Sequence, residues 1–147
     1  MTDITLAQAN LIIEAVLKKG RELKLPKLTV AVVDRGGHLI ALQRDDGATF
    51  LRPDISLAKA WGALALGVNT RDVSKRYESG TREEGFINGL NALTSGRIVP
   101  LPGGVIIKNP KGEPCGAVGV SGAVSEDDES CAVAGITAAG LQAHGVD

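Results

Sequence analysis

One of the two histidines in this 147-residue sequence lies where chemistry is expected. His38 follows the pair Gly36-Gly37 between two runs rich in β-branched residues, with Arg35 and Arg44 on either side. A neutral imidazole in that position could ligate iron or move a proton, while the arginines hold carboxylates. A solvent-facing residue at the end of a hairpin explains His38 equally well. We expect His144, near the end of the chain, to be solvated at a helix end.

Two further side chains are candidates for binding or catalysis. Lys59 is the only charged residue between Asp54 and Arg71, on an alanine-rich stretch that we expect to pack against a sheet. Its ammonium could anchor an anion or act as a base with a lowered pKa, although a side chain that snorkels to the surface is the commoner outcome. Glu84 could act as an acid or base. It does not pair with Glu83, because neighbouring residues on a helix point about 100° apart, and helix capping also explains it.

Glycines and acidic residues supply weaker signals. Gly103 and Gly104 stand at the entrance of a predicted strand, where they could let a flat ligand approach the backbone or simply form a turn. The glycines of Gly116–Gly122 match neither the dinucleotide fingerprint nor a Walker sequence. The acidic run 125–129 would repel phosphate, and we interpret it as complementing a helix N-terminus rather than binding a metal.

The composition argues against several classes of partner. Sixteen basic and 17 acidic residues nearly cancel, and no basic stripe accompanies the few aromatic residues, so nucleic acid and anionic membranes are disfavoured. No signal peptide or long apolar run is evident, so we expect a cytoplasmic protein. Cys115 and Cys131 are too far apart for a CxxC motif and are expected to be reduced structural thiols. The length fits one domain, residues 1–147.

The elements that would position these residues alternate between helices and hairpins. Thr5-x-x-Gln8 and Thr81-x-x-Glu84 both read as capping boxes at helix starts. Apolar periodicity and turn residues supply the other boundaries. The predicted order is a helix from Thr5 to Gly20, strands 28–34 and 39–44, a helix from Pro53 and Asp54 to Gly67, short helices over 69–93, strands 105–109 and 115–121, and a helix from Ser125 to His144 and Gly145.

The first hairpin is the element that carries His38. With Gly36-Gly37 as a two-residue turn, Val33 pairs with Ile40 and the strand ends with Arg44. Both faces of the hairpin are then apolar at their centre. We therefore expect helices on both sides of the sheet, or a partner subunit, to cover them.

An ordered set of short motifs gives the chain a family resemblance. The set is 32–39 (VVDRGGHL), 44–48 (RDDGA), 58–60 (AKA), 100–104 (PLPGG), 116–122 (GAVGVSG), Asp128 and 132–135 (AVAG). Together these motifs span nearly the whole chain, and in this order they resemble the GlcG/HbpS family, which is related to the C-terminal domain of PduO proteins. The resemblance implies a profilin-like α/β (α+β) fold, with an antiparallel sheet of about five strands flanked by helices. It also implies homo-oligomers, haem or a related tetrapyrrole as ligand in some members, and genes placed beside catabolic pathways.

Two functions of different classes follow. In the first, the protein binds a small planar ligand such as haem, with His38 on the iron and Arg35 or Arg44 on the propionates. In the second, it is a small enzyme for an oxo or hydroxy acid, in which Arg44 or Lys59 grips the carboxylate and His38 or Glu84 moves a proton. Scarce aromatic residues weigh against the first, and the lack of a metal or nucleophile motif weighs more against the second. A purely structural or partner-binding role is a third possibility.

Overall fold

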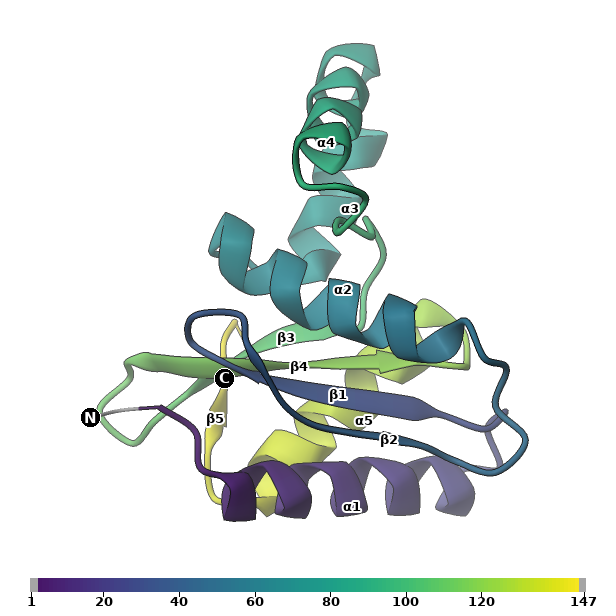
Figure 1. The fold of residues 1–147 in the computed structure, drawn as a ribbon, viewed down its shortest axis with the longest axis vertical. Coiled ribbons are helices and arrows are strands. Elements are labelled where there is room, and N and C mark those ends of the chain that lie inside the picture. The colour runs from purple at the N-terminus through teal and green to yellow at the C-terminus, as the bar shows by residue number, and fades with distance from the viewer. Residues whose placement is uncertain (1–2, 146–147) are drawn as a thin grey trace.

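The structure is a computed structural model that describes residues 3–145. Its elements are α1 (Leu6–Glu22), β1 (Thr29–Asp34), β2 (Leu39–Arg44), α2 (Arg52–Leu66), α3 (Thr70–Glu78), α4 (Thr81–Leu93), β3 (Gly104–Lys108), β4 (Pro114–Ser121), α5 (Ser125–Ala138) and β5 (Gln142–Ala143). The strands form one antiparallel sheet of order β2-β1-β4-β3-β5 (Figure 1). This confirms the predicted fold class, an antiparallel sheet of five strands flanked by helices.

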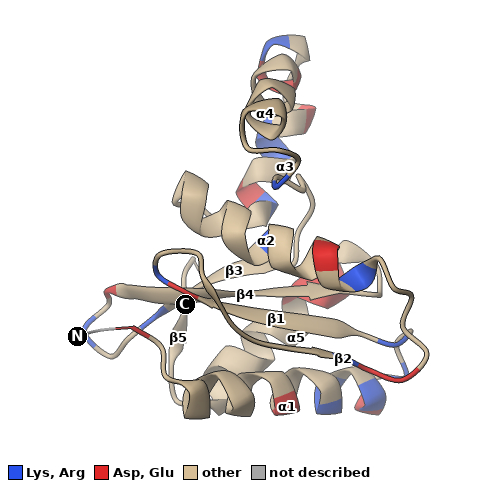
Figure 2. Cartoon of the chain, in the orientation of Figure 1, with Lys and Arg blue, Asp and Glu red and all other residues tan. Residues whose placement is uncertain are grey.

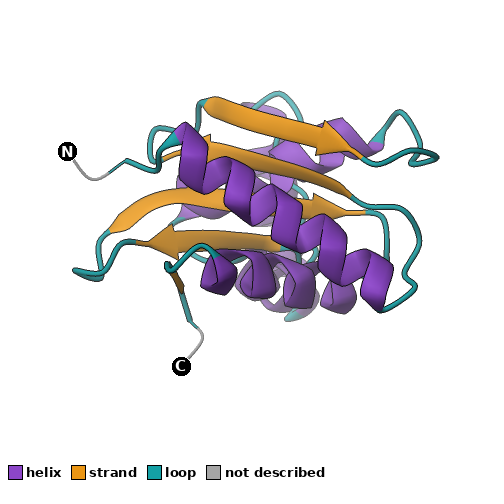
Figure 3. Ribbon diagram, turned by 90° about the horizontal axis from the view of Figure 1, so that it is seen from below, coloured by secondary structure: helices purple, strands orange, loops and turns teal. Residues whose placement is uncertain are grey.

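Helices cover both faces of the sheet. Helices α1 and α5 lie side by side across one face (Figure 3), and α2 lies across the other. Val30 and Val32 of β1 join the large apolar cluster on the α1 and α5 side, whereas Val33 packs with Ala60 and Ala117 under α2. Strand β1 is therefore buried on both faces, as its unbroken apolar run predicts.

Glycines in β4 let α2 lie close to the sheet. A Cβ on Gly119 would collide with the backbone carbonyl of Ser56 in α2. A Cβ on Gly116 would come within 2.5 Å of the carbonyl oxygen of Val33 in β1. Gly119 thus allows the close packing of α2 on β4, and Gly116 allows the close approach of β1.

The predicted helix starts are close to the observed ones, but their capping differs. Thr5 makes the complete capping box with Gln8 at the start of α1. At the start of α4 the N-cap is Gly80 with no side-chain cap bond, so the box predicted for Glu84 is wrong. Helix α2 likewise begins without a side-chain cap, and Asp54 lies inside its first turn rather than at the N-cap.

The turn of the first hairpin is one residue longer than predicted. The N–H of Asp34 donates to the carbonyl of His38, and that of Gly37 donates to the carbonyl of Asp34. Gly37 has φ 83°, so the loop is a turn followed by a left-handed glycine, the usual three-residue hairpin. Val33 consequently pairs with Leu39 instead of its predicted partner, while the register further from the turn is the predicted one.

The last helix ends earlier than predicted. Helix α5 stops at Ala138, and Gly140 turns the chain with φ 76°. The next residues form the short strand β5 against β3 at the edge of the sheet. His144 follows this strand, half-buried, and its backbone N–H donates to the carbonyl of Ile106. The predicted solvated helix end at His144 is therefore wrong.

Helices α3 and α4 form an arm that stands away from the sheet beyond α2 (Figure 1). Among the described elements, α4 packs against α3 alone. Val73, Ile87 and Ile98 form the small apolar cluster between the helices and the segment that follows them. Charged residues of both signs lie along the arm (Figure 2). Within residues 3–145, no helix is both long and apolar enough to cross a membrane.

Candidate functional site

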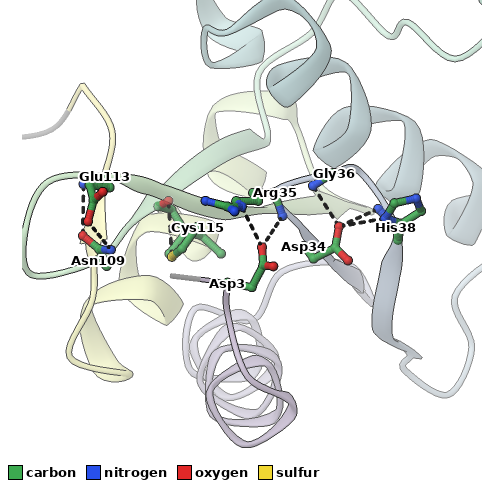
Figure 4. A network of polar contacts seen from close by, with 9 residues as sticks. Asp3, Asp34, Arg35, Gly36, His38, Asn109, Glu113 and Cys115 are labelled. Carbon is green, nitrogen blue, oxygen red and sulfur yellow. Dashed lines mark hydrogen bonds and ion pairs between the residues drawn. The ribbon is translucent and has the colours of Figure 1, made fainter. Parts of the chain in front are cut away.

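The turn between β1 and β2 holds His38 through one carboxylate. The Oδ1 atom of Asp34 accepts the backbone N–H of Gly36 at 2.9 Å and that of His38 at 3.0 Å. The same oxygen lies 3.2 Å from Nδ1 of the His38 ring (Figure 4). The carboxylate therefore fixes both the shape of the loop and the position of the imidazole at its end.

The contact with Asp34 also decides which ring nitrogen of His38 is available. Because the carboxylate can only accept a hydrogen bond, Nδ1 of His38 carries the proton that it donates. In the neutral ring Nε2 is then unprotonated, which is the form that binds a metal. Burial acts to raise the pKa of Asp34, but the hydrogen bonds from the backbone of His38 and Gly36 and the charge of the ring outweigh it and lower that pKa. The carboxylate thus stays ionised at neutral pH.

A pocket of about 550 Å³ opens beside this histidine. Its walls come from the β1–β2 turn, from one face of α2, and from the segment between α4 and β3. The residues that the site uses are His38, Leu39, Asp54, Leu57, Trp61 and Arg97. The side chain of His38 is 82% exposed, so its ring stands at the rim of the pocket and not inside the core.

Trp61 and the turn glycine shape the end of this pocket nearest His38. A Cβ on Gly37 would lie 2.8 Å from Cδ1 of the Trp61 indole, so only glycine lets the turn approach the ring this closely. The guanidinium carbon of Arg97 lies 3.8 Å from the centroid of the indole, a cation–π contact. Arg97 and the turn that carries His38 therefore approach the same aromatic ring.

Lys59 lies elsewhere, in a buried ion pair. Its Nζ donates to Oδ2 of Asp128 at 3.1 Å and to the carbonyl oxygen of Val120 at 3.0 Å, and the two charged side chains are 3% and 1% exposed. Asp128 also accepts the backbone N–H of Ala123, just before α5. The prediction of a snorkelling lysine is wrong, because the two acceptors that bind its ammonium, on Asp128 and Val120, are buried beneath α2.

Burial also dominates the titration of this pair. It lowers the pKa of Lys59 against the opposing attraction of Asp128, and it raises the pKa of Asp128 against the attraction of Lys59. The ammonium of Lys59 is thus engaged within the protein. The structure does not place it at the pocket beside His38.

Gly103 and Gly104 are also packed inside the protein. A Cβ on Gly103 would come within 2.8 Å of Nζ of Lys59, and one on Gly104 would collide with the backbone carbonyl of Lys59. Both glycines are buried. What approaches the backbone at this strand entrance is α2 and its lysine, so the structure leaves no room there for a flat ligand.

The remaining predicted residues do not converge on His38. Arg44 ends β2, six residues from His38, which places it roughly 20 Å away along an extended strand. Glu84 is exposed on the arm, and the helix that carries it packs only against α3 among the described elements. Arg35 is beside His38 in sequence, but it forms an ion pair with Asp3 at 3.5 Å (Figure 4). The predicted convergence of His38, Arg44 and Lys59 is therefore wrong within one chain.

Sequence reasoning missed Asp34 and Arg97 as members of this site. The signal for Asp34 was its position four residues before His38 across two glycines, where a short acidic side chain can cap the turn. No sequence signal marked Arg97, because its place beside the indole depends on where the segment after the arm returns to α2.

Comparison with known proteins gives consistent matches over nearly the whole chain. The model of a family described as "Haem degrading protein HbpS-like" matches residues 4–137. An uncharacterized 15.0 kDa protein in the dhaT-dhaS intergenic region of Citrobacter freundii is 38% identical over 126 residues, which are 85% of this chain and 84% of that protein.

Two solved structures share the fold. HbpS superposes with a TM-score of 0.78 at 28% identity, covering 93% of this chain and 90% of HbpS. A PduOC–haem complex superposes with a TM-score of 0.84 at 24% identity, covering 97% of this chain and 99% of that chain. The PduOC likeness concerns the fold alone, since so few residues are shared.

Proposed function

The chain belongs to the HbpS-like family, and on that premise we propose that it binds haem in the pocket beside His38. The ligand class comes from relatives, since the family is described by haem degradation and PduOC was solved with haem. The location proposed for the ligand is argued from this chain's own residues.

The observation that carries the proposal is the hydrogen bond between the Asp34 carboxylate and Nδ1 of His38. A histidine that ligates a metal commonly donates its other ring N–H to a carboxylate, which fixes the tautomer and makes the ligating nitrogen more basic. Nε2 of His38 is then the iron ligand. If bound, haem would supply a redox-active iron whose potential and reactivity depend on the residue that holds it.

The walls of the pocket fit a flat, largely apolar ring. Leu57 and Trp61 project from one face of α2, and Leu39 adds an apolar side chain that is 51% exposed. Pockets for small ligands usually combine such apolar walls with a few polar groups, in volumes of about 300–1,000 Å³. The volume of about 550 Å³ lies within this range. Burial of Leu39 and Trp61 by the ligand would add to the free energy of binding.

Haem titration followed by absorbance tests this proposal, with a matched pair of histidine variants. The native protein should give a shifted Soret band that saturates, and His38→Ala should lose the shift. His144→Ala is the control, because it removes the only other imidazole and its backbone bonds to Ile106 and Asn69 do not need the side chain. An absent shift in the native protein, or an equal shift in His38→Ala, would refute the assignment.

We also propose that a second copy of the chain covers β2. This strand is at the edge of the sheet, and its Ile40, Ala41 and Leu42 are only half-buried. An edge strand with apolar side chains tends to pair or to be covered. Light scattering should therefore give a mass at least twice the 15.2 kDa of one chain, and a monomer at micromolar concentration would contradict the proposal.

A further inference from the structure

The pocket beside His38 has opposite charges at its two ends. Asp54, Leu57, Ala58 and Trp61 share one face of α2 at helical spacing, so this face runs from a carboxylate to an indole. The separation of seven positions between Asp54 and Trp61 corresponds to about 10 Å along the helix. Arg97 lies on the indole at the other end and is the one arginine or lysine in the pocket wall among the described residues. A ligand with a carboxylate is therefore attracted to one end and repelled from the other.

Arg97 is held in place before any ligand arrives. Its Nε donates to the carbonyl oxygen of Thr94 at 2.9 Å, and its guanidinium lies over the Trp61 ring. These two contacts reduce the side-chain entropy that a flexible arginine loses on binding. In the part of the chain that the structure describes, no acceptor engages the two Nη groups of Arg97. They remain able to donate to a carboxylate in the planar, two-pronged manner that arginine favours.

We propose that Arg97 binds a carboxylate of the ligand, so that the site selects tetrapyrroles with free propionates over neutral ones. This inference rests on the proposed function. It assigns to Arg97 the propionate contact that sequence reasoning had given to Arg35 or Arg44. It also orients the ligand. The acidic edge of the ring faces Arg97 and Trp61, and the apolar edge lies along α2 between Leu57 and Asp54.

The single tryptophan of the chain gives a readout at this contact. A ligand over Trp61 should quench its fluorescence, and the titration gives affinity without relying on iron ligation. Haem and haem dimethyl ester, delivered in the same solvent, would be titrated into the native protein, Arg97→Gln and Arg82→Gln. Arg82 is an exposed arginine on the arm and serves as the matched control.

Only the pairs that keep both Arg97 and the free propionates of haem should bind at full affinity. Arg97→Gln should weaken haem binding roughly fivefold, the size expected for an exposed ion pair. The dimethyl ester should bind the native protein about as weakly as haem binds Arg97→Gln. Arg97→Gln should not weaken binding of the ester any further. Arg82→Gln should leave both affinities unchanged. Equal affinities for haem and its ester in the native protein, or a loss in Arg82→Gln as large as that in Arg97→Gln, would overturn the inference.

Iron-free protoporphyrin IX separates the failure of this inference from the failure of haem ligation. If His38 is not the iron ligand but Arg97 holds the propionates, protoporphyrin will still quench Trp61 in an Arg97-dependent manner. If haem shifts the Soret band through His38 but every ligand binds Arg97→Gln as it binds the native protein, only the propionate contact is refuted. Absence of any quenching by haem or protoporphyrin would refute both.

Discussion

The buried pair of Lys59 and Asp128 should be costly to break from either side. Lys59→Met keeps most of the length of the side chain and removes the ammonium, which leaves the 1%-exposed carboxylate with the N–H of Ala123 as its remaining donor. Breaking a buried pair by removing one partner typically costs about 3–5 kcal/mol, out of a total stability of roughly 5–15 kcal/mol. Lys18→Met is the control. Its surface pair with Glu22, at 3.9 Å, should contribute less than about 0.5 kcal/mol.

The double variant separates the pair from its surroundings. Asp128→Asn removes the charge and keeps an oxygen for the Ala123 N–H, so Lys59→Met with Asp128→Asn leaves no buried charge at this position. It should cost about 1–2 kcal/mol, mainly for the lost bond to the Val120 carbonyl. The measurement is the free energy of unfolding from urea denaturation followed by circular dichroism. The sum of the losses in Lys59→Met and in Asp128→Asn should exceed the loss in the double variant by more than 2 kcal/mol.

The pH dependence of Lys59→Met is a second test of the same pair. Burial already raises the pKa of Asp128, and without Lys59 only the hydrogen bond from Ala123 and the charge of Arg52 oppose that effect. A folded-state pKa above the unfolded value means that the folded protein binds the extra proton, so stability falls as pH rises toward the folded pKa. Lys59→Met should therefore be less destabilised at pH 5 than at pH 8. A loss below 1 kcal/mol, or one independent of pH, would refute a buried charge pair.

Three other predictions concern the turn, the packing of α2 and the helix caps. Asp34→Asn should weaken haem binding about tenfold in a Soret titration, because the imidazole loses the carboxylate that orients it. Its stability should converge with that of the native protein as pH falls below 3.8, since a carboxylate with a lowered pKa stabilises the fold only while ionised. Gly119→Ala should lower the free energy of unfolding by about 3 kcal/mol or more, measured by thermal or urea unfolding, because its Cβ meets backbone atoms of α2. Gly85→Ala, in open space on α4, should raise it by up to about 1 kcal/mol. Thr5→Ala should cost about 1 kcal/mol and Thr81→Ala much less, since only the first caps its helix; equal losses would contradict the observed caps.

Local signals in the sequence predicted most of the fold. The Thr5 capping box, the Gly67 helix end and the paired turn glycines are short-range features that depend on a few neighbouring residues. The errors arose where distant segments meet. Strand β5 forms because β3 offers it an edge to pair with. The sequence around Gly140 gave no sign of that edge, so the helix was predicted to continue to His144 and Gly145.

The site was predicted less completely for the same reason. His38 was identified because glycines and arginines surround it in the sequence. The partner of Lys59 is 69 residues away, so an alanine-rich helix with one lysine could equally face solvent or an acid. Arg97 reaches Trp61 only because the chain returns to α2 after the arm. Such contacts are properties of the folded topology and have no local sequence pattern.

The central claim is that Nε2 of His38 ligates the iron of a bound haem. The most direct measurement is electron paramagnetic resonance with nuclear hyperfine detection, on ferric haem bound to protein labelled with ¹⁵N-histidine. The native protein and His144→Ala should show coupling between the iron and an imidazole ¹⁵N, and His38→Ala should show none. Coupling that persists in His38→Ala, or a native complex that binds haem without any ¹⁵N coupling, would contradict the claim.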